Sequence, residues 1–132
     1  MSTVRRLTPT TRIRAGLRMP TDVRDVFERE LNAARKADTA EQRWQAMERA
    51  HIVSQPWPWP HTRAHLAMFA QAVREHDRKE ALGQVVRLLV AAPGSAMGRY
   101  PEGNTGRATV GITAPMPVPE DLERLLARHA VR

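Results

Sequence analysis

Apolar residues recur every three or four positions over most of the chain, which is the spacing of amphipathic helices. From residue 21, the stretch TDVRDVFERELNAARKA follows this spacing with Val23, Val26, Phe27, Leu31 and Ala34. A second helix is predicted in TAEQRWQAMERAHIV, where Thr39 and Gln42 have the spacing of a capping box. These two segments together resemble one hairpin of a helical repeat.

Prolines and a capping pair separate the next two helices. The second segment ends at the prolines of SQPWPWP, and Pro60 is expected to be the first residue of a helix over 60–75. The fourth helix is predicted to follow Asp77, with Asp77 and Glu80 as a capping box, and to end at Pro93. Because the connections are short, successive helices should pack antiparallel.

The last part of the chain has a different composition. Residues 93–118 are rich in glycine and proline and predict a long loop, and PEDLERLLARH predicts a terminal helix over 119–129. The predicted fold is all-α, a small antiparallel bundle of about four core helices of the helical-hairpin, repeat-like kind. We expect one helical domain over 20–132, preceded by a basic, flexible N-terminal arm over 1–19.

The arm carries most of the excess positive charge. The chain has a formal net charge of +7, and its first 18 residues contain five arginines and no acid. These arginines are Arg5, Arg6, Arg12, Arg14 and Arg18. Such an arm could bind nucleic acid through phosphate contacts. A terminal tail without a partner is the simpler interpretation.

Several classes of protein are disfavoured by composition. The chain has no cysteine, which excludes disulfides, cysteine-based zinc sites and thiol catalysis. No apolar run approaches the roughly 20 residues that a membrane-spanning helix needs. No apolar segment follows the N-terminal arginines, as a secretory signal would require. These features favour a cytoplasmic protein.

Histidines are concentrated in the middle third of the chain, which holds four of the five. In an antiparallel hairpin centred on Trp57, His51 comes close to His61, and Glu48 comes close to His65. His61 and His65 share one helix face because they lie four residues apart. We therefore expect one cluster of candidate metal ligands, formed by Glu48, His51, His61 and His65.

The rise of a helix per residue and the antiparallel packing also predict which other residues lie near this cluster. His76 follows His61 by 15 residues, about 22 Å along a straight helix, and is therefore excluded. The fourth helix runs back toward the cluster, so the loop after Pro93 leaves from the same end and could cover the site. Gln55, Gln84 or backbone carbonyls are candidates to orient the imidazole rings.

Three imidazoles and a carboxylate form a plausible donor set for Zn²⁺, Fe²⁺, Mn²⁺ or Cu²⁺, which spacing does not distinguish. Haem bound by one of these histidines is a less favoured alternative. Any one of these histidines taken alone is more simply a buried structural residue. The metalloprotease motif HExxH is absent, since Thr62 stands where its glutamate would be. Whether the protein is an enzyme stays open.

Several stretches resemble a known family. AHIVSQP, PHTRAHLAM and GRYPEGNTGRATV are distinctive in combination, and the resemblance covers roughly residues 23–126. In these stretches the chain is similar to a family of small bacterial proteins known only as a domain of unknown function. The resemblance implies a bacterial origin and no established activity, and it carries over no functional residues.

The sequence thus predicts a metal-binding helical protein that acts in metal handling or as a metal-dependent enzyme. The alternative is a non-enzymatic interaction module, in which the histidines are structural. That module would bind nucleic acid or protein through the basic arm. The sequence does not predict an oligomeric state.

Overall fold

The computed structural model describes residues 18–96, 102–111 and 116–129. Within these ranges the chain forms helices and no strand, which confirms the predicted all-α class. The helices are α1 (Thr21–Lys36), α2 (Ala40–Ser54), α3 (Pro58–Arg74), α4 (Arg78–Ala96) and α5 (Glu120–Ala127). None of these helices is both long and apolar enough to cross a membrane.

Side-chain caps explain where two of the helices begin. The hydroxyl of Thr39 accepts a hydrogen bond from the backbone N–H of Gln42 at 3.2 Å, before α2. The carboxylate of Asp77 accepts one from the backbone N–H of Glu80 at 3.0 Å, before α4. Each cap satisfies a backbone donor that the first turn of a helix leaves free. The sequence prediction of Thr39 and Asp77 as N-caps is confirmed, whereas the carboxylate of Glu80 bonds to Arg107 and Ala108 instead of completing a capping box.

Two prolines lie differently from the prediction. α3 begins at Pro58, and Pro60 therefore occupies the third helical position instead of the first. Both positions tolerate proline, because the first turn of a helix does not use these N–H groups internally. α4 continues through Pro93 to Ala96 instead of ending at Pro93. The carbonyl that loses its helical partner belongs to Leu89, which is 74% exposed, so water can satisfy it.

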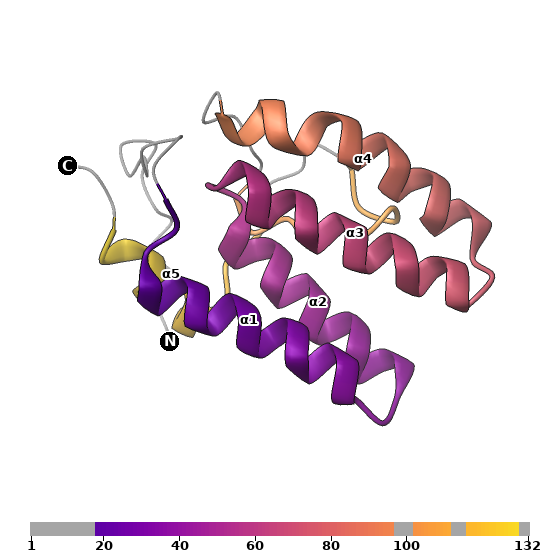
Figure 1. The fold of residues 1–132 in the computed structure, drawn as a ribbon, viewed down its shortest axis with the longest axis horizontal. Helices are drawn as coiled ribbons and strands as arrows, with labels where there is room; N and C mark the ends of the chain where they lie inside the picture. The colour runs from indigo at the N-terminus through magenta and orange to yellow at the C-terminus, as the bar shows by residue number, and fades with distance from the viewer. Residues whose placement is uncertain (1–17, 97–101, 112–115, 130–132) are drawn as a thin grey trace.

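The four long helices lie side by side in chain order, from α1 to α4 (Figure 1). Two antiparallel hairpins, α1 with α2 and α3 with α4, pack through the contact between α2 and α3. The short helix α5 lies against the end of the first hairpin, near the start of α1. The segment 102–111 crosses back from α4 to α2, since Arg107 pairs with Glu80 and Glu48.

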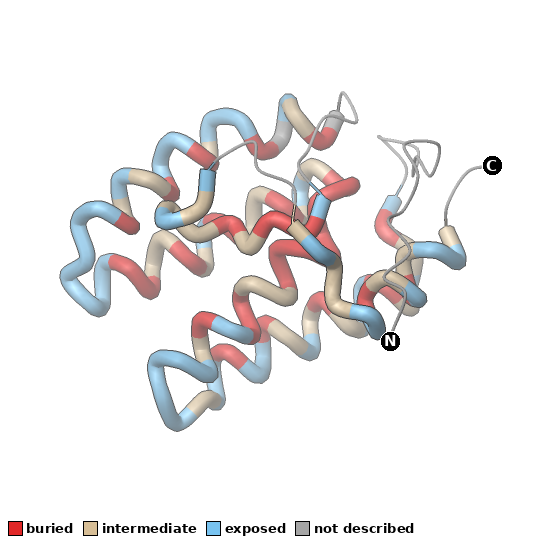
Figure 2. The backbone as a smooth tube through the Cα atoms, turned by 180° about the vertical axis from the view of Figure 1, so that it is seen from behind, coloured by how far each residue is buried: buried red, intermediate tan, exposed pale blue. Residues whose placement is uncertain are grey.

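Two apolar clusters hold the bundle together. The larger joins α1, α2 and α5 and includes Val23, Phe27, Val53, Trp57 and Leu122. The smaller joins α2 to α3 through Trp44, Met47, Met68 and Ala72. Buried backbone positions gather where the helices and the 102–111 segment face one another, whereas much of α4 is exposed (Figure 2). The buried side chains of α4 are mostly polar, and the candidate site lies where they meet α2 and α3.

Replacing Phe27 by alanine should reduce the free energy of unfolding by about 3–5 kcal/mol, because a large core side chain leaves a cavity. Phe27 is 1% exposed. Urea unfolding followed by circular dichroism measures the loss. Val73→Ala is the control, since Val73 is 52% exposed on α3 and should change stability by less than about 0.5 kcal/mol. Equal losses in the two variants would contradict this assignment of the core.

Candidate metal centre

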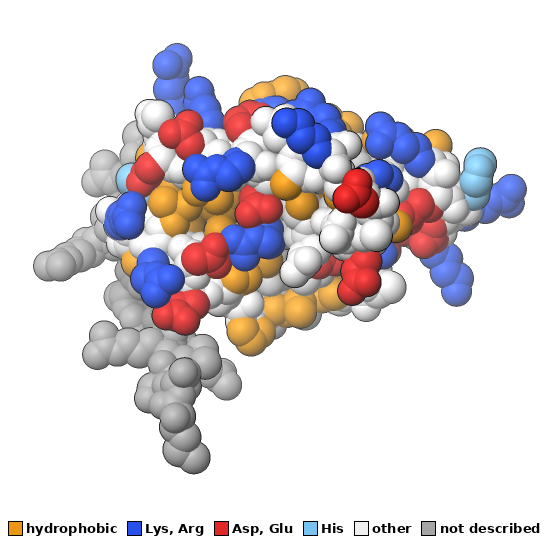
Figure 3. Space-filling view, turned by 90° about the horizontal axis from the view of Figure 1, so that it is seen from below, with side chains coloured by type: hydrophobic (Ala, Val, Ile, Leu, Met, Phe, Trp, Pro, Cys, Tyr) orange, Lys and Arg blue, Asp and Glu red, His pale blue; other side chains and the backbone are white. Residues whose placement is uncertain are grey.

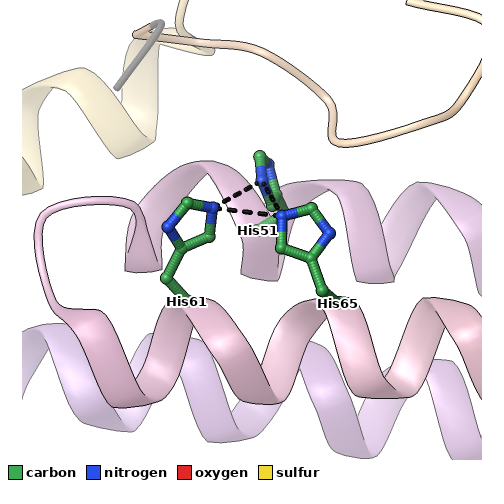
Figure 4. Close-up of side chains that lie close together, drawn as sticks. All are labelled: His51, His61 and His65. Carbon is green, nitrogen blue, oxygen red and sulfur yellow. Dashed lines mark hydrogen bonds between the residues drawn. The ribbon is translucent and has the colours of Figure 1, made fainter. Parts of the chain in front are cut away.

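Three imidazole rings from α2 and α3 converge on one another (Figure 4). His51 lies in the last turn of α2, and His61 and His65 lie one turn apart on α3. The Nε2 atom of His51 is 3.0 Å from that of His61 and 3.1 Å from that of His65. The remaining Nε2 pair, of His61 and His65, is 3.2 Å apart. The three nitrogens therefore form a nearly equilateral triangle.

The other nitrogen of each ring has an acceptor of its own. The Nδ1 of His51 lies 2.7 Å from the backbone carbonyl of Asn104. The Nδ1 of His65 lies 2.7 Å from the side-chain carbonyl of Gln84. The Nδ1 of His61 lies 2.7 Å from the hydroxyl oxygen of Ser95.

These partners determine which ring nitrogen carries the proton. A backbone carbonyl only accepts, so the Nδ1 of His51 must donate. The amide nitrogen of Gln84 donates to Glu80 at 3.0 Å and to the carbonyl of Gly106 at 2.8 Å, which directs its oxygen at His65. Ser95 donates its single proton to the carbonyl of Gln55 at 2.5 Å, and its oxygen therefore accepts. Each of the three histidines consequently donates through Nδ1.

With their protons on Nδ1, neutral imidazoles turn three bare Nε2 lone pairs toward one another. The dashed lines of Figure 4 join these atoms at hydrogen-bonding distance, but no proton remains to place between them. Such contacts are repulsive unless an electron-pair acceptor lies within reach of all three. A metal cation is an acceptor of this kind. The cluster could therefore hold a metal ion.

The environment keeps the rings neutral. The side chains are nearly inaccessible, with 2% of His51, 6% of His61 and 3% of His65 exposed. Burial lowers the pKa of His51 well below its usual range, and the neighbouring imidazoles add to this effect. Burial likewise lowers the pKa of His61 to about 3 and that of His65 to about 4. Metal ions bind the neutral form, so the rings need lose no proton at neutral pH.

The segment 102–111 covers the cluster on one side. Besides the carbonyl of Asn104, Gly106 lies directly on His51. A Cβ atom at Gly106 would come within 2.8 Å of that ring, and Gly106 has a φ of +84°. The same loop also lies close to α4, since a Cβ atom at Gly83 of α4 would lie 2.3 Å from the Cβ of Ala108. Glycine is therefore required on both sides for the loop to approach the helices this closely.

The Glu80 side chain supports the covering loop and the site, which is a different role from the capping predicted for it. Its side chain is 2% exposed. It accepts hydrogen bonds from the Nε of Arg107 at 2.9 Å and from the backbone N–H of Ala108 at 3.0 Å. It also accepts a hydrogen bond from the side-chain amide of Gln84, which in turn orients His65. Glu80 therefore holds the covering loop and supports one imidazole at once.

Glu48 lies apart from the three rings. Its carboxylate pairs with the guanidinium of Arg107 at 3.5 Å, and that guanidinium stacks 3.7 Å above the ring of Trp44. Burial raises the pKa of Glu48, and the charge of Arg107 opposes this shift. Among the described residues, the group with convergent ligand atoms contains His51, His61 and His65 and no carboxylate. The structure thus brings together three of the four predicted ligands.

The other predictions about the neighbourhood have mixed outcomes. His76 lies in the turn between α3 and α4, outside the cluster, as predicted. Gln84 orients a ring through its side chain, whereas Gln55 contributes its backbone carbonyl to Ser95.

Four of the five arginines of the N-terminal arm lie outside the described residues, and only Arg18 lies within them. On the face drawn in Figure 3, acidic and basic side chains are interspersed instead of segregated. This face therefore presents no continuous basic surface of the kind that binds nucleic acid.

Two polar residues of the site were not predicted from the sequence. The sequence does not predict Ser95 because Pro93 is expected to end α4. A serine near the end of a helix that packs beside histidines could nevertheless have indicated a hydrogen-bond partner for an imidazole. Asn104 acts through its backbone carbonyl, which any residue provides, so its identity carries no such information. Its side chain instead shapes the loop by accepting from the N–H of Gly106 at 2.9 Å.

Residues 21–126 match a family model described as Protein of unknown function (DUF3703), and the chain therefore belongs to this family. This match confirms the family resemblance found in the sequence. Comparison with curated proteins and with solved structures finds no match. Since the family description assigns no activity, the function has to be argued from the geometry of the histidine cluster.

The metal-free protein should lose stability when the pH falls from 7 to 5. The folded-state pKa values of His61 and His65 lie below the ordinary 6.5, so the unfolded chain takes up protons first. Their stabilising effect is complete above pH 6.5 and declines toward pH 3–4, by up to about 1.4 kcal/mol per pH unit for each histidine. Urea unfolding in the presence of a chelator measures the slope.

In this experiment His65→Gln should have a shallower slope, because one titrating group is gone. His76→Gln should keep the slope of the wild type, since His76 is exposed and lies outside the cluster. A slope that is the same in all three proteins would contradict the buried, neutral state of the cluster.

Gly106→Ala should displace the loop from the cluster, because the added Cβ overlaps the His51 ring and the residue has a positive φ. We expect a loss of about 2–3 kcal/mol in unfolding free energy. Gly111→Ala, at an exposed position of the same loop, should cost less than about 0.5 kcal/mol. Nuclear magnetic resonance of the imidazole nitrogens would show whether His51 alone loses its Nδ1 hydrogen bond. Unchanged stability and spectra would contradict the close contact.

Proposed function

We propose that this member of the DUF3703 family binds one transition-metal ion through the Nε2 atoms of His51, His61 and His65. The observation that carries this proposal is the set of Nδ1 hydrogen bonds, each of which leaves an Nε2 lone pair directed at the centre of the cluster. Three lone pairs held 3.0–3.2 Å apart in a buried place are costly without a cation.

The spacing of the nitrogens supports a small cation. In tetrahedral coordination with metal–nitrogen bonds of about 2.0–2.1 Å, ligand nitrogens lie about 3.3–3.4 Å apart. The observed separations are 3.0–3.2 Å. A movement of a few tenths of an ångström would therefore bring the rings to ideal positions, with rotation about the side chains of α3 as the simplest route.

The donor set also limits the choice of metal. Imidazole nitrogen suits zinc, copper and iron, whereas Mg²⁺, Ca²⁺ and Mn²⁺ prefer oxygen ligands. Of the metals considered from the sequence, manganese is therefore the least suited. A haem group is disfavoured as well, because three nitrogens this close together leave no space for a porphyrin between them. We propose zinc, copper or iron, with a fourth position open to water or another small ligand.

Metal binding is favoured over catalysis. A hydrolytic site would need a free general base near the fourth position. The nearest carboxylates of the described chain are engaged, Glu80 with Arg107 and Gln84, and Glu48 with Arg107. We therefore propose a role in holding or transferring the metal. The interaction-module alternative depends on the N-terminal arginines, and no observation on the described residues favours it.

Elemental analysis of the protein purified without an affinity tag tests the proposal. We expect close to one zinc, copper or iron per chain, or uptake of one equivalent when metal-free protein is titrated. The double variant His61→Ala/His65→Ala should retain none. Resonances of the imidazole nitrogens should move in His51, His61 and His65 together when the metal binds.

The matched control is His76→Ala/His129→Ala, which removes the two histidines outside the cluster and should bind metal as the wild type does. Circular dichroism establishes that each variant is folded, and His65→Gln replaces the double variant if that one is not. A folded wild type that neither retains nor takes up zinc, copper or iron would overturn the proposal.

A further inference from the structure

Helix α4 is amphipathic with its polar face turned inward. Its buried positions are mostly polar or charged and recur at helical spacing: Glu80, Gln84, Arg87, Ala91 and Ser95. These side chains support the histidines and bind the 102–111 loop, as in the bonds from Arg87 to the carbonyls of Arg107 at 3.0 Å and Val110 at 2.5 Å. The polar face of α4 is therefore buried in the protein interior.

The opposite, solvent-facing side of α4 is apolar. Five large side chains form this stripe, with exposed fractions of 68% for Leu82, 41% for Val85, 52% for Val86, 74% for Leu89 and 47% for Val90. Single exposed apolar residues are common on soluble proteins, but a contiguous row along one helix usually marks a contact surface. The stripe is continuous over more than two turns of α4.

The order of residues in the stripe identifies what would cover it. The segment LGQVVRLL, residues 82–89, places Leu and Val symmetrically about the bond between Val85 and Val86. When two copies of α4 pack antiparallel across a two-fold axis at this point, Leu82 faces Leu89 of the second copy, and Val85 faces Val86. Self-complementarity of this kind is what an isologous interface requires. We propose that α4 is the dimerisation helix of this protein.

The charges at the ends of α4 favour the antiparallel arrangement. Arg78 and Lys79 are exposed in the first turn, and the last turn has no basic residue. The same symmetry puts Arg78 opposite Pro93 of the second copy, near the partially negative C-terminal end of that helix. A parallel pair would instead place Arg78 and Lys79 beside their own copies, where like charges repel.

A membrane surface fits this face less well than a second copy does. Helices that lie on membranes carry basic residues along the polar face, from which they reach the lipid headgroups. In α4 the polar face is buried and contains Glu80, and the exposed cations are confined to the first turn. The proposed dimer needs no metal, and its interface is on the side of α4 away from the histidines.

Sedimentation velocity over a range of concentrations tests the dimer. We expect the mass to rise from that of the 14.9 kDa chain to twice this value. One pair of helices is a small interface, so dissociation should be measurable in the micromolar range. Val86→Glu should abolish the dimer. Val73→Glu is the matched control, because this valine on α3 is also 52% exposed and lies off the stripe, and this variant should still dimerise.

A wild type that stays monomeric up to about 1 mM, the weak limit of specific association, would overturn the proposal. A dimer that persists in Val86→Glu would do the same. Flotation of the wild type, but not of Val86→Glu, with vesicles containing anionic lipid would assign the stripe to a membrane surface instead, if the protein is monomeric in solution.

Oxidative cross-linking tests the orientation of the helices, and the absence of native cysteine makes it simple. In the antiparallel dimer, Leu82→Cys/Leu89→Cys should form disulfide-linked dimers. Leu82→Cys alone should not, because its two copies would be about 10 Å apart along the helices, beyond the reach of a disulfide. Efficient cross-linking of the single variant would contradict the antiparallel arrangement and indicate a parallel one.

Discussion

The Nδ1 hydrogen bonds of the three histidines are the interactions on which the rest of this structure depends. The three acceptor oxygens lie on two structural elements: His61 bonds to Ser95 in the last turn of α4, His65 to Gln84 in the middle of α4, and His51 to Asn104 in the loop. Together they tie α2 and α3 to α4 and to the loop. They also select one tautomer in every ring, so that the same bonds that join the elements prepare three Nε2 lone pairs for a cation.

This arrangement explains the unusual orientation of α4. A buried group of imidazoles needs oxygen acceptors around it, and the loop needs partners for its backbone carbonyls and N–H groups. α4 supplies them with Glu80, Gln84, Arg87 and Ser95, and its valines and leucines therefore face outward. The polar side of α4 faces the histidines and the loop, and its apolar side therefore faces solvent. The proposed metal site and the proposed dimer surface accordingly lie on opposite sides of the same helix.

Glu80 shows how closely the support of the site and the packing of the loop are connected. Its carboxylate is buried and accepts hydrogen bonds from Arg107, Ala108 and Gln84. A buried charge is tolerated only when it is paired and fully hydrogen-bonded, and here these bonds come from three different residues. Gln84 donates a hydrogen bond to Glu80 and accepts one from His65. A change in the charge of Glu80 would therefore alter the hydrogen bond that orients His65 in the candidate site. The negative charge also lies behind a ring that would carry part of the charge of a bound cation.

The sequence alone determined the local features. The apolar spacing predicted the helices, the side chains of Thr39 and Asp77 predicted their caps, and the short connection at Trp57 brought His51 to the His61–His65 pair. These features depend on residues near one another in the chain or on one hairpin, where spacing is sufficient.

Only the tertiary structure decided which polar groups complete the site. Ser95 acts because α4 continues beyond Pro93, Asn104 acts through a backbone carbonyl, and Glu48 bonds to Arg107 instead of joining the rings. The sequence also does not predict that the polar face of α4 is buried, because an amphipathic pattern does not show which face of a helix points to the interior. Long-range packing makes these choices, and it does so by finding a partner for each buried donor and acceptor.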